Sequence, residues 1–223
     1  MQNPFFDFGP GNYQKRENPL ERNVRKKQDV LRPIMEGYSR LLEKEIRDLA
    51  WLVEHQHVVR AYRDAVASIR GLQYDPDTIE AFCEELDRSD SFPYRIPGPA
   101  GLYLSALVNQ CKTDHIILRL MNCQRTFHFL GYGLAEGKTL ILQGNGGDFS
   151  GAGLHGGRLV VKGSTGNWCG AGMMKGEIWV DKHAGQNTGE WMQAGEIRID
   201  GFIGSMGKHL FGGRIYQQGK LIS

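Results

Sequence analysis

The chain has 223 residues, and its 27 Lys and Arg against 25 Asp and Glu give a formal net charge of +2. This near-balance disfavours nucleic acid as a partner, because polyanion binding usually needs a clear excess of basic residues. No window approaches about 20 consecutive apolar residues, and the first residues, MQNPFFDFGPGN, lack a basic region followed by an apolar one. We therefore expect a cytoplasmic protein with neither a membrane span nor a secretory signal.

Residues 1–32 are predicted to form a basic N-terminal arm. Seven basic side chains outnumber three acidic ones between residues 15 and 32. A charge run of this kind is typical of a solvated surface.

Residues 33–112 are predicted to form a helical domain. Apolar residues recur at steps of three and four from Ile34 to Ile69, Gly71 is placed to end this run, and Asp75 with Pro76 is a start signal for a helix through about Leu86. The three prolines of SFPYRIPGPAG, residues 91–101, predict an irregular connector, followed by a short helix over 102–108.

Residues 113–223 contain a repeat of short β-branched segments separated by glycines. KTLILQG, GRLVVKG, GEIWVDK, GEIRIDG and GRIYQQG start at residues 138, 157, 176, 195 and 213, which gives three steps of 19 and one of 18. A fixed period near 20 marks a solenoid, and the Leu and Asn ladder of leucine-rich repeats is missing. The fold class predicted is α+β: helices followed by a right-handed parallel β-helix with coils of about 19 residues.

Glycines recur at fixed offsets within each repeat. Because glycine takes positive φ and permits close backbone approach, we interpret them as structural residues at the corners of the coils. They are Gly144, Gly147, Gly151, Gly163, Gly166, Gly170, Gly185, Gly189, Gly201, Gly204 and Gly207.

Alternation along the strands predicts which side chains line the interior. Leu140, Leu159, Ile178, Ile197 and Ile215 share one inward offset. The outward offsets place three pairs of opposite charge on neighbouring coils, about 4.8 Å apart. These pairs are Arg158 with Glu177, Glu196 with Arg214, and Lys162 with Asp181.

The segment GAGLHGG, residues 151–157, contains a G-x-G-x-x-G pattern. A dinucleotide-binding turn needs a helix to open at the last glycine, whereas here RLVVKG follows and predicts a strand. The repeat already accounts for these glycines apart from Gly153, so we expect no nucleotide site.

The pattern from GGDFSGAG to GEIRIDG resembles the GXGXG β-helix at the C-terminal end of the glutamate synthase large subunit. It equally resembles the GXGXG-containing subunit of formylmethanofuran dehydrogenase and of the related formyltransferase/hydrolase complex. The resemblance covers about residues 130 to 219. It implies a scaffold that joins or spaces catalytic domains of an oxidoreductase or formyl-transfer complex, with the chemistry on other subunits.

No catalytic, cofactor-binding or metal-ligating residue is predicted. The sequence has no HExxH, no CxxC pair and no P-loop lysine, and its four cysteines are expected to be reduced thiols. Cys169 and His183 lie in consecutive coils, but Cys169 shares its offset with Ser150 and Thr188, which indicates a small corner residue. His55 and His57 are two apart on a predicted helix and therefore point to different sides.

The outward central offset of the repeat is apolar and predicts an interface. Its candidate residues are Ile141, Val160, Trp179 and Tyr216. Such a strip is normally covered, either by the N-terminal helices of the same chain or by a protein partner.

Three functional hypotheses follow from the sequence. The first is a non-catalytic assembly subunit of a redox, one-carbon or glutamate-synthase-like complex, bound to catalytic subunits or to itself. The second is a stand-alone transferase or hydrolase with a site between helices and β-helix, where His128, His155 or Cys169 would converge. The third is a structural protein whose coils stack end to end.

Overall fold

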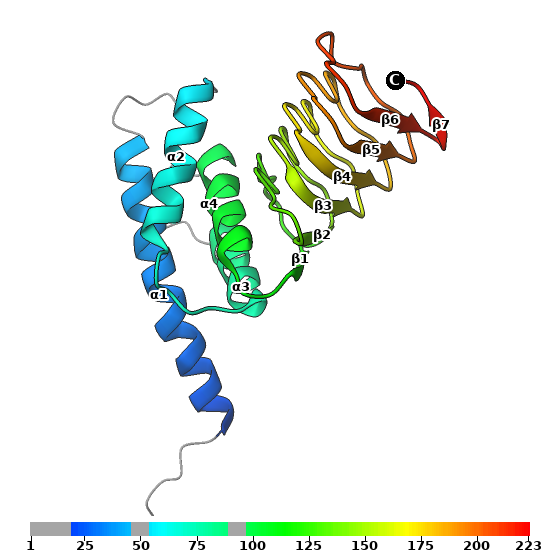
Figure 1. Ribbon diagram of the computed structural model, residues 1–223. Helices are drawn as coiled ribbons and strands as arrows, with labels where there is room; N and C mark the ends of the chain where they lie inside the picture. The colour runs from blue at the N-terminus through cyan, green and yellow to red at the C-terminus, as the bar shows by residue number, and fades with distance from the viewer. Residues whose placement is uncertain (1–18, 46–53, 89–96) are drawn as a thin grey trace, which may run out of the picture.

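The computed structural model describes residues 19–45, 54–88 and 97–223, and these form four helices followed by seven strands (Figure 1). The helices lie together at one end, and the coils of a parallel β-helix stack away from them toward the C-terminus. The helices are α1 Pro19–Glu45, α2 His55–Ser68, α3 Pro76–Arg88 and α4 Pro97–Gln110. The strands are β1 His115–Arg119, β2 Thr139–Gln143, β3 His155–Val161, β4 Lys175–Val180, β5 Glu196–Ile199, β6 Arg214–Gln217 and β7 Lys220–Leu221.

Helix α1 begins at Pro19, inside the segment assigned to the basic arm, and continues through Pro33. The helical run predicted from the sequence began at Pro33, because the recurring apolar steps begin at Ile34. The helix nevertheless continues through Pro33. The residues that follow this proline, including Ile34, Tyr38 and Leu41, pack in the core. Within the described ranges, no helix has the length and apolar character needed to cross a membrane.

Helix α4 corrects the prediction of an irregular connector over residues 91–101. It begins at Pro97 and includes Pro99, both of which lie in the first turn. Amide groups in the first turn of a helix have no partner within the helix, so prolines are tolerated there. Residues 89–96 lie outside the described part of the chain. Helix α3 starts as predicted, with Asp75 accepting a hydrogen bond from the amide of Thr78 at 2.8 Å.

Strands β1 to β6 form one parallel ladder in sequence order, as the repeat predicts. Leu140 pairs with Leu159, Leu159 with Ile178, and Ile178 with Ile197, so each coil adds one strand to the same sheet. These side chains are buried in a continuous apolar core together with the residues two positions further along each strand, Leu142, Val161, Val180 and Ile199. Strand β3 begins at His155 and includes Gly156, the last glycine of the G-x-G-x-x-G pattern, where a dinucleotide turn would begin a helix. The pattern therefore belongs to the β-helix.

The helical domain closes the β-helix at its first coil. Helix α4 is almost completely buried, and Leu104 and Leu107 share one core with Ile116 and Leu130 of that coil. Gly101 lies so close to the first coil that a Cβ atom there would overlap the carbonyl oxygen of His128. The helices therefore cover the end of the solenoid, which would otherwise expose an open sheet edge.

The last coil ends differently from the others. Strand β7 turns back and pairs antiparallel with β6, placing Leu221 opposite Tyr216. Some backbone groups of β6 that could pair with a strand of a further coil are thus already paired with β7.

Candidate functional site

Exposed apolar side chains are concentrated on the β-helix. In the part of the chain that the structure describes, every large apolar side chain that is exposed lies after residue 115. Contiguous apolar surface of this kind marks interaction sites more often than scattered single residues do. The exposed side chains are Ile117, Met121, Met174, Trp179, Trp191, Phe202, Phe211, Leu221 and Ile222.

One group of apolar residues runs across the strands on the outer face of the sheet. We call this group the outer strip; it consists of the central outward residue of each strand from β1 to β6. Helix α3 reaches the sheet at β1, where Glu80 pairs with Arg119, and Trp179 on β4 remains 40% exposed. The residues of the outer strip are Ile117, Ile141, Val160, Trp179, Arg198 and Tyr216.

Arginines cover part of the aromatic surface in the outer strip. The guanidinium carbon of Arg158 lies 5.1 Å from the ring centre of Trp179, and that of Arg198 lies 4.7 Å from the ring centre of Tyr216. Cation–π contacts at exposed sites contribute about 0.5 to 1 kcal/mol each.

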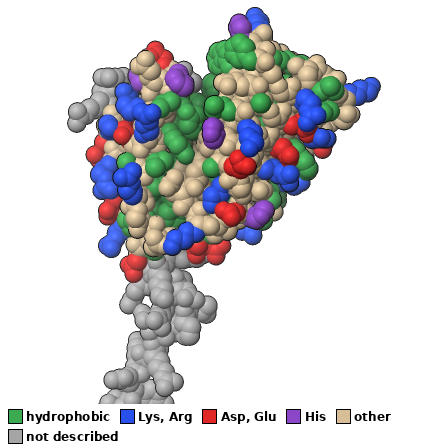
Figure 2. All heavy atoms as spheres, in the orientation of Figure 1, with side chains coloured by type: hydrophobic (Ala, Val, Ile, Leu, Met, Phe, Trp, Pro, Cys, Tyr) green, Lys and Arg blue, Asp and Glu red, His purple; other side chains and the backbone are tan. Residues whose placement is uncertain are grey.

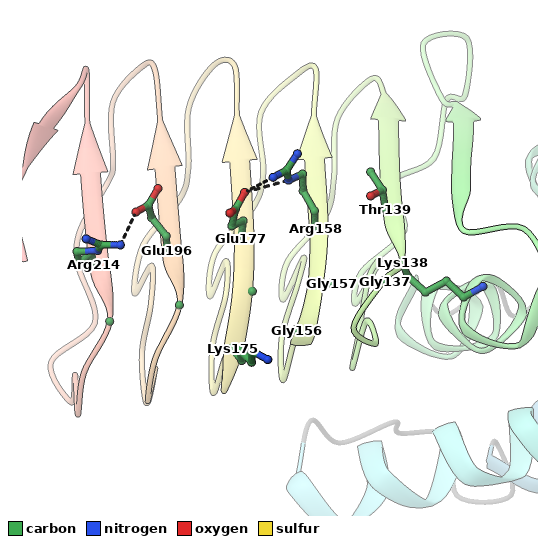
Figure 3. Close-up of a pocket in the computed structure, with 13 residues that line it drawn as sticks. Gly137, Lys138, Thr139, Gly156, Gly157, Arg158, Lys175, Glu177, Glu196 and Arg214 are labelled. Carbon is green, nitrogen blue, oxygen red and sulfur yellow. Dashed lines mark hydrogen bonds and ion pairs between the residues drawn. The ribbon is translucent and has the colours of Figure 1, made fainter.

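Charged side chains flank the outer strip on both sides. Figure 3 shows one flank, where Arg158 points to Glu177 on the next strand and Arg214 points to Glu196, with atom separations of 2.9 and 3.2 Å. On the other flank, Lys162 pairs with Asp181 at 3.2 Å. All three pairs were predicted from the repeat.

A groove with a volume of about 690 Å³ follows the flank in Figure 3. Its lining alternates between glycines and side chains that already have ionic partners, including Lys175, which pairs with Glu136 at 2.9 Å. The charged side chains named here are paired within the chain, so none of them is free to bind a small charged ligand.

At another corner of the coils, aromatic rings form a stack. Phe129, Phe149 and Trp168 occupy equivalent positions, each with φ near 60°, and each precedes a corner glycine by two residues. Ring centres are 4.6 Å apart between Phe129 and Phe149, and 5.7 Å apart between Phe149 and Trp168. Trp191 extends the stack, with its ring centre 5.4 Å from that of Trp168. It stands at a different position of the repeat, which is occupied by Gly172 in the preceding coil.

Beside this stack lies an apolar hollow of about 660 Å³ between α2 and the β-helix. Figure 2 shows hydrophobic side chains along the upper edge of the β-helix, beside the notch that separates it from the helices. Small residues from two consecutive coils, Ala152, Gly153, Ala171 and Gly172, line part of the hollow. The hollow is lined by His55, Val58, Phe129, Tyr132, Phe149, Ala152, Gly153, Ala171, Gly172, Met174, Trp191, Gln193 and Phe211.

The side chains considered for catalysis do not converge. Cys169 is completely buried in the core, and burial raises the pKa of its thiol to about 11. His183 is exposed, stacks on Phe202 and accepts a hydrogen bond from its amide. His128 faces Asp148 at 3.5 Å, whereas His155 is at the start of β3. The geometry thus gives Cys169 neither a thiolate nor a histidine base.

Glu190, between β4 and β5, is a buried carboxylate whose partners lie in the next coil. Glu190 receives a hydrogen bond from the amide of Lys208 at 2.5 Å and contacts the ring of His209. Burial alone would raise the pKa of Glu190, but the hydrogen bonds from His209 and Lys208 outweigh it and lower this pKa below its usual value. Within residues 28–45, 54–88 and 98–223, no group of three His, Cys, Asp or Glu side chains could hold a metal ion.

Sequence reasoning missed the aromatic stack and the hollow. The stack had a signal, since an aromatic residue stands two positions before a corner glycine at 129, 149 and 168. The hollow had none, because α2 reaches it from a distant part of the chain.

No protein-family model, no curated protein and no solved structure matches this chain. The resemblance to the GXGXG β-helix therefore rests on the glycine pattern. The fold itself consists of four N-terminal helices followed by a parallel β-solenoid of about four turns.

Proposed function

We propose that this protein is a non-catalytic assembly subunit of a multi-subunit enzyme complex, of the redox, one-carbon or glutamate-synthase-like kind. Its β-helix holds a catalytic protein subunit against the hollow beside α2. The GXGXG-like pattern favours this class of complex, because that β-helix serves such enzymes as a scaffold.

The observation that carries the proposal is the group of exposed apolar side chains around the hollow. The hollow combines Trp191, 47% exposed, and Phe211, 72% exposed, with small alanine and glycine residues. Exposed aromatic side chains of this kind suit a protein partner, since buried aromatic residues provide much of the binding energy at interfaces.

The two other hypotheses have less support. A stand-alone enzyme needs polar groups that converge at the junction of the domains, whereas the polar side chains that line the hollow include only His55, Tyr132 and Gln193. Growth by end-to-end stacking needs an open last strand, and β7 pairs with part of β6.

The test is to purify the tagged full chain from its native host and to identify what accompanies it. We expect an enzyme subunit in constant proportion to the chain. Recovery of the chain alone, or only as assemblies of itself, would refute the assembly role.

A further inference from the structure

We propose that the outer face of the sheet is a self-complementary surface through which two copies of this chain form a two-fold dimer. The occupant of the outer strip is thus a second copy, not the catalytic protein at the hollow. The argument rests on the order of charges along the two flanks of the strip.

Consider two copies packed face to face about a two-fold axis that runs parallel to the strands, between β3 and β4. The axis reverses the order of the strands and keeps their direction, so β3 of one copy faces β4 of the other. Arg158 pairs with Glu177 of its own chain and then also faces Glu177 of the second copy. Lys162 likewise pairs with Asp181 of its own chain and faces Asp181 of the second copy. Because the contact is symmetric, each of these pairs occurs twice.

Two other two-fold arrangements oppose like charges. An axis along the β-helix reverses strand direction, which sets Arg158 against Lys162 and Glu177 against Asp181 of the second copy. An axis between β4 and β5 sets Glu177 against Glu196. Like charges in direct opposition disfavour a contact. The axis between β3 and β4 also places all six parallel strands opposite a strand of the second copy.

The centre of this arrangement is apolar. Val160, which is 9% exposed, meets Trp179 of the other copy on both sides of the axis. Farther out, Ile141 faces Arg198, and at the ends Ile117 faces Tyr216. An apolar centre bordered by complementary charges is the usual anatomy of a specific protein interface. The arginine that covers Trp179 within the chain, Arg158, also provides the ionic contact to the second copy.

The area indicates a reversible dimer. Six strands about 4.8 Å apart and about five residues long cover roughly 480 Å² per copy, or about 960 Å² in total. Stable specific interfaces bury about 1,200 to 2,000 Å², so this contact falls below that range, where weak and transient interfaces lie. We expect a dimer that dissociates on dilution through micromolar concentrations.

The decisive experiment uses two charge reversals, Arg158→Glu and Glu177→Arg, in the full chain. Each variant alone opposes like charges twice in its own dimer, whereas a mixture of the two restores both opposite pairs. Sedimentation velocity is measured from about 1 to about 200 µM, a range that brackets weak affinities. We expect a dimer for the unchanged chain, monomers for each variant, and a dimer for the mixture.

Dimer formation in the mixture also shows that both variants are folded. The matched control is a pair of exposed tryptophans: Trp179→Ala should weaken the dimer at least tenfold, and Trp191→Ala, outside the strip, should leave it unchanged. A monomeric unchanged chain, single variants that dimerise like it, or a mixture that stays monomeric would each overturn the proposal. Equal effects of the two tryptophan variants would also overturn it.

Discussion

At the scale of single residues, glycines of one repeat perform two different tasks. Gly170 and Gly172 are two positions apart and have nearly the same conformation, with φ of 68° and 63°. A Cβ at Gly170 would lie 2.5 Å from Cδ1 of Ile197, in the core, whereas a Cβ at Gly172 would meet no atom within 4 Å. Gly172 thus supplies only positive φ, and Gly170 supplies positive φ and space.

This difference predicts unequal effects of the same substitution. Gly172→Ala should reduce the free energy of unfolding by about 1 kcal/mol, the usual penalty of a side chain in the left-handed region. Gly170→Ala should reduce it by about 1 to 3 kcal/mol more, because the new methyl group displaces Ile197. Urea-induced unfolding measures both. Equal losses would mean that the coils adjust without strain.

Glu190 gives the stability of the last coil a dependence on pH. Its folded pKa is lowered, so its contribution to stability is complete above the unfolded pKa of about 4.3 and is lost as the pH falls through the lower folded value. Glu190→Gln should lower the melting temperature near neutral pH, and the difference from the unchanged chain should shrink below about pH 4. Thermal melts across this range provide the measurement, with the exposed Glu43→Gln as the control. A difference that stays constant with pH would contradict the role of the ionised carboxylate.

At the scale of elements, the repeat made the β-helix predictable and its first coil less so. Strands β2 to β5 follow one another at a fixed step, so their register and charge pairs could be derived from the sequence. The first step, from His115 on β1 to Thr139 on β2, is longer at 24 residues, and β1 was not predicted as part of the ladder. The start of α4 was placed too late, because Pro97 and Pro99 were taken as signs of an irregular connector.

The fit of α4 on the first coil should depend on Gly101. Alanine favours a helix over glycine by about 1 kcal/mol, so any loss on Gly101→Ala comes from overlap with the carbonyl of His128. We expect a net loss of about 2 kcal/mol or more in the free energy of unfolding.

The reverse change at an exposed site of α2, Ala67→Gly, measures helix preference alone and should cost about 1 kcal/mol. Chemical denaturation compares the two variants. If Gly101→Ala stabilised the protein, α4 would not bear directly on the backbone of the β-helix.

At the scale of the whole molecule, the β-helix presents two apolar surfaces on different faces. The outer strip could be predicted from the sequence, because strand alternation defines it. The hollow could not, since its walls come from α2 and from several coils. The chain therefore carries a surface suited to a second copy and another suited to a different protein.

The most direct test of this account is to purify three tagged chains from the native host under identical conditions: the unchanged chain, Trp179→Ala, and Trp191→Ala combined with Phe211→Ala. We measure the amount of enzyme subunit and of untagged chain recovered with each. The account predicts that Trp179→Ala loses the second copy and keeps the enzyme, whereas the double variant loses the enzyme and keeps the second copy. Loss of the enzyme from Trp179→Ala, or its full retention by the double variant, would contradict it.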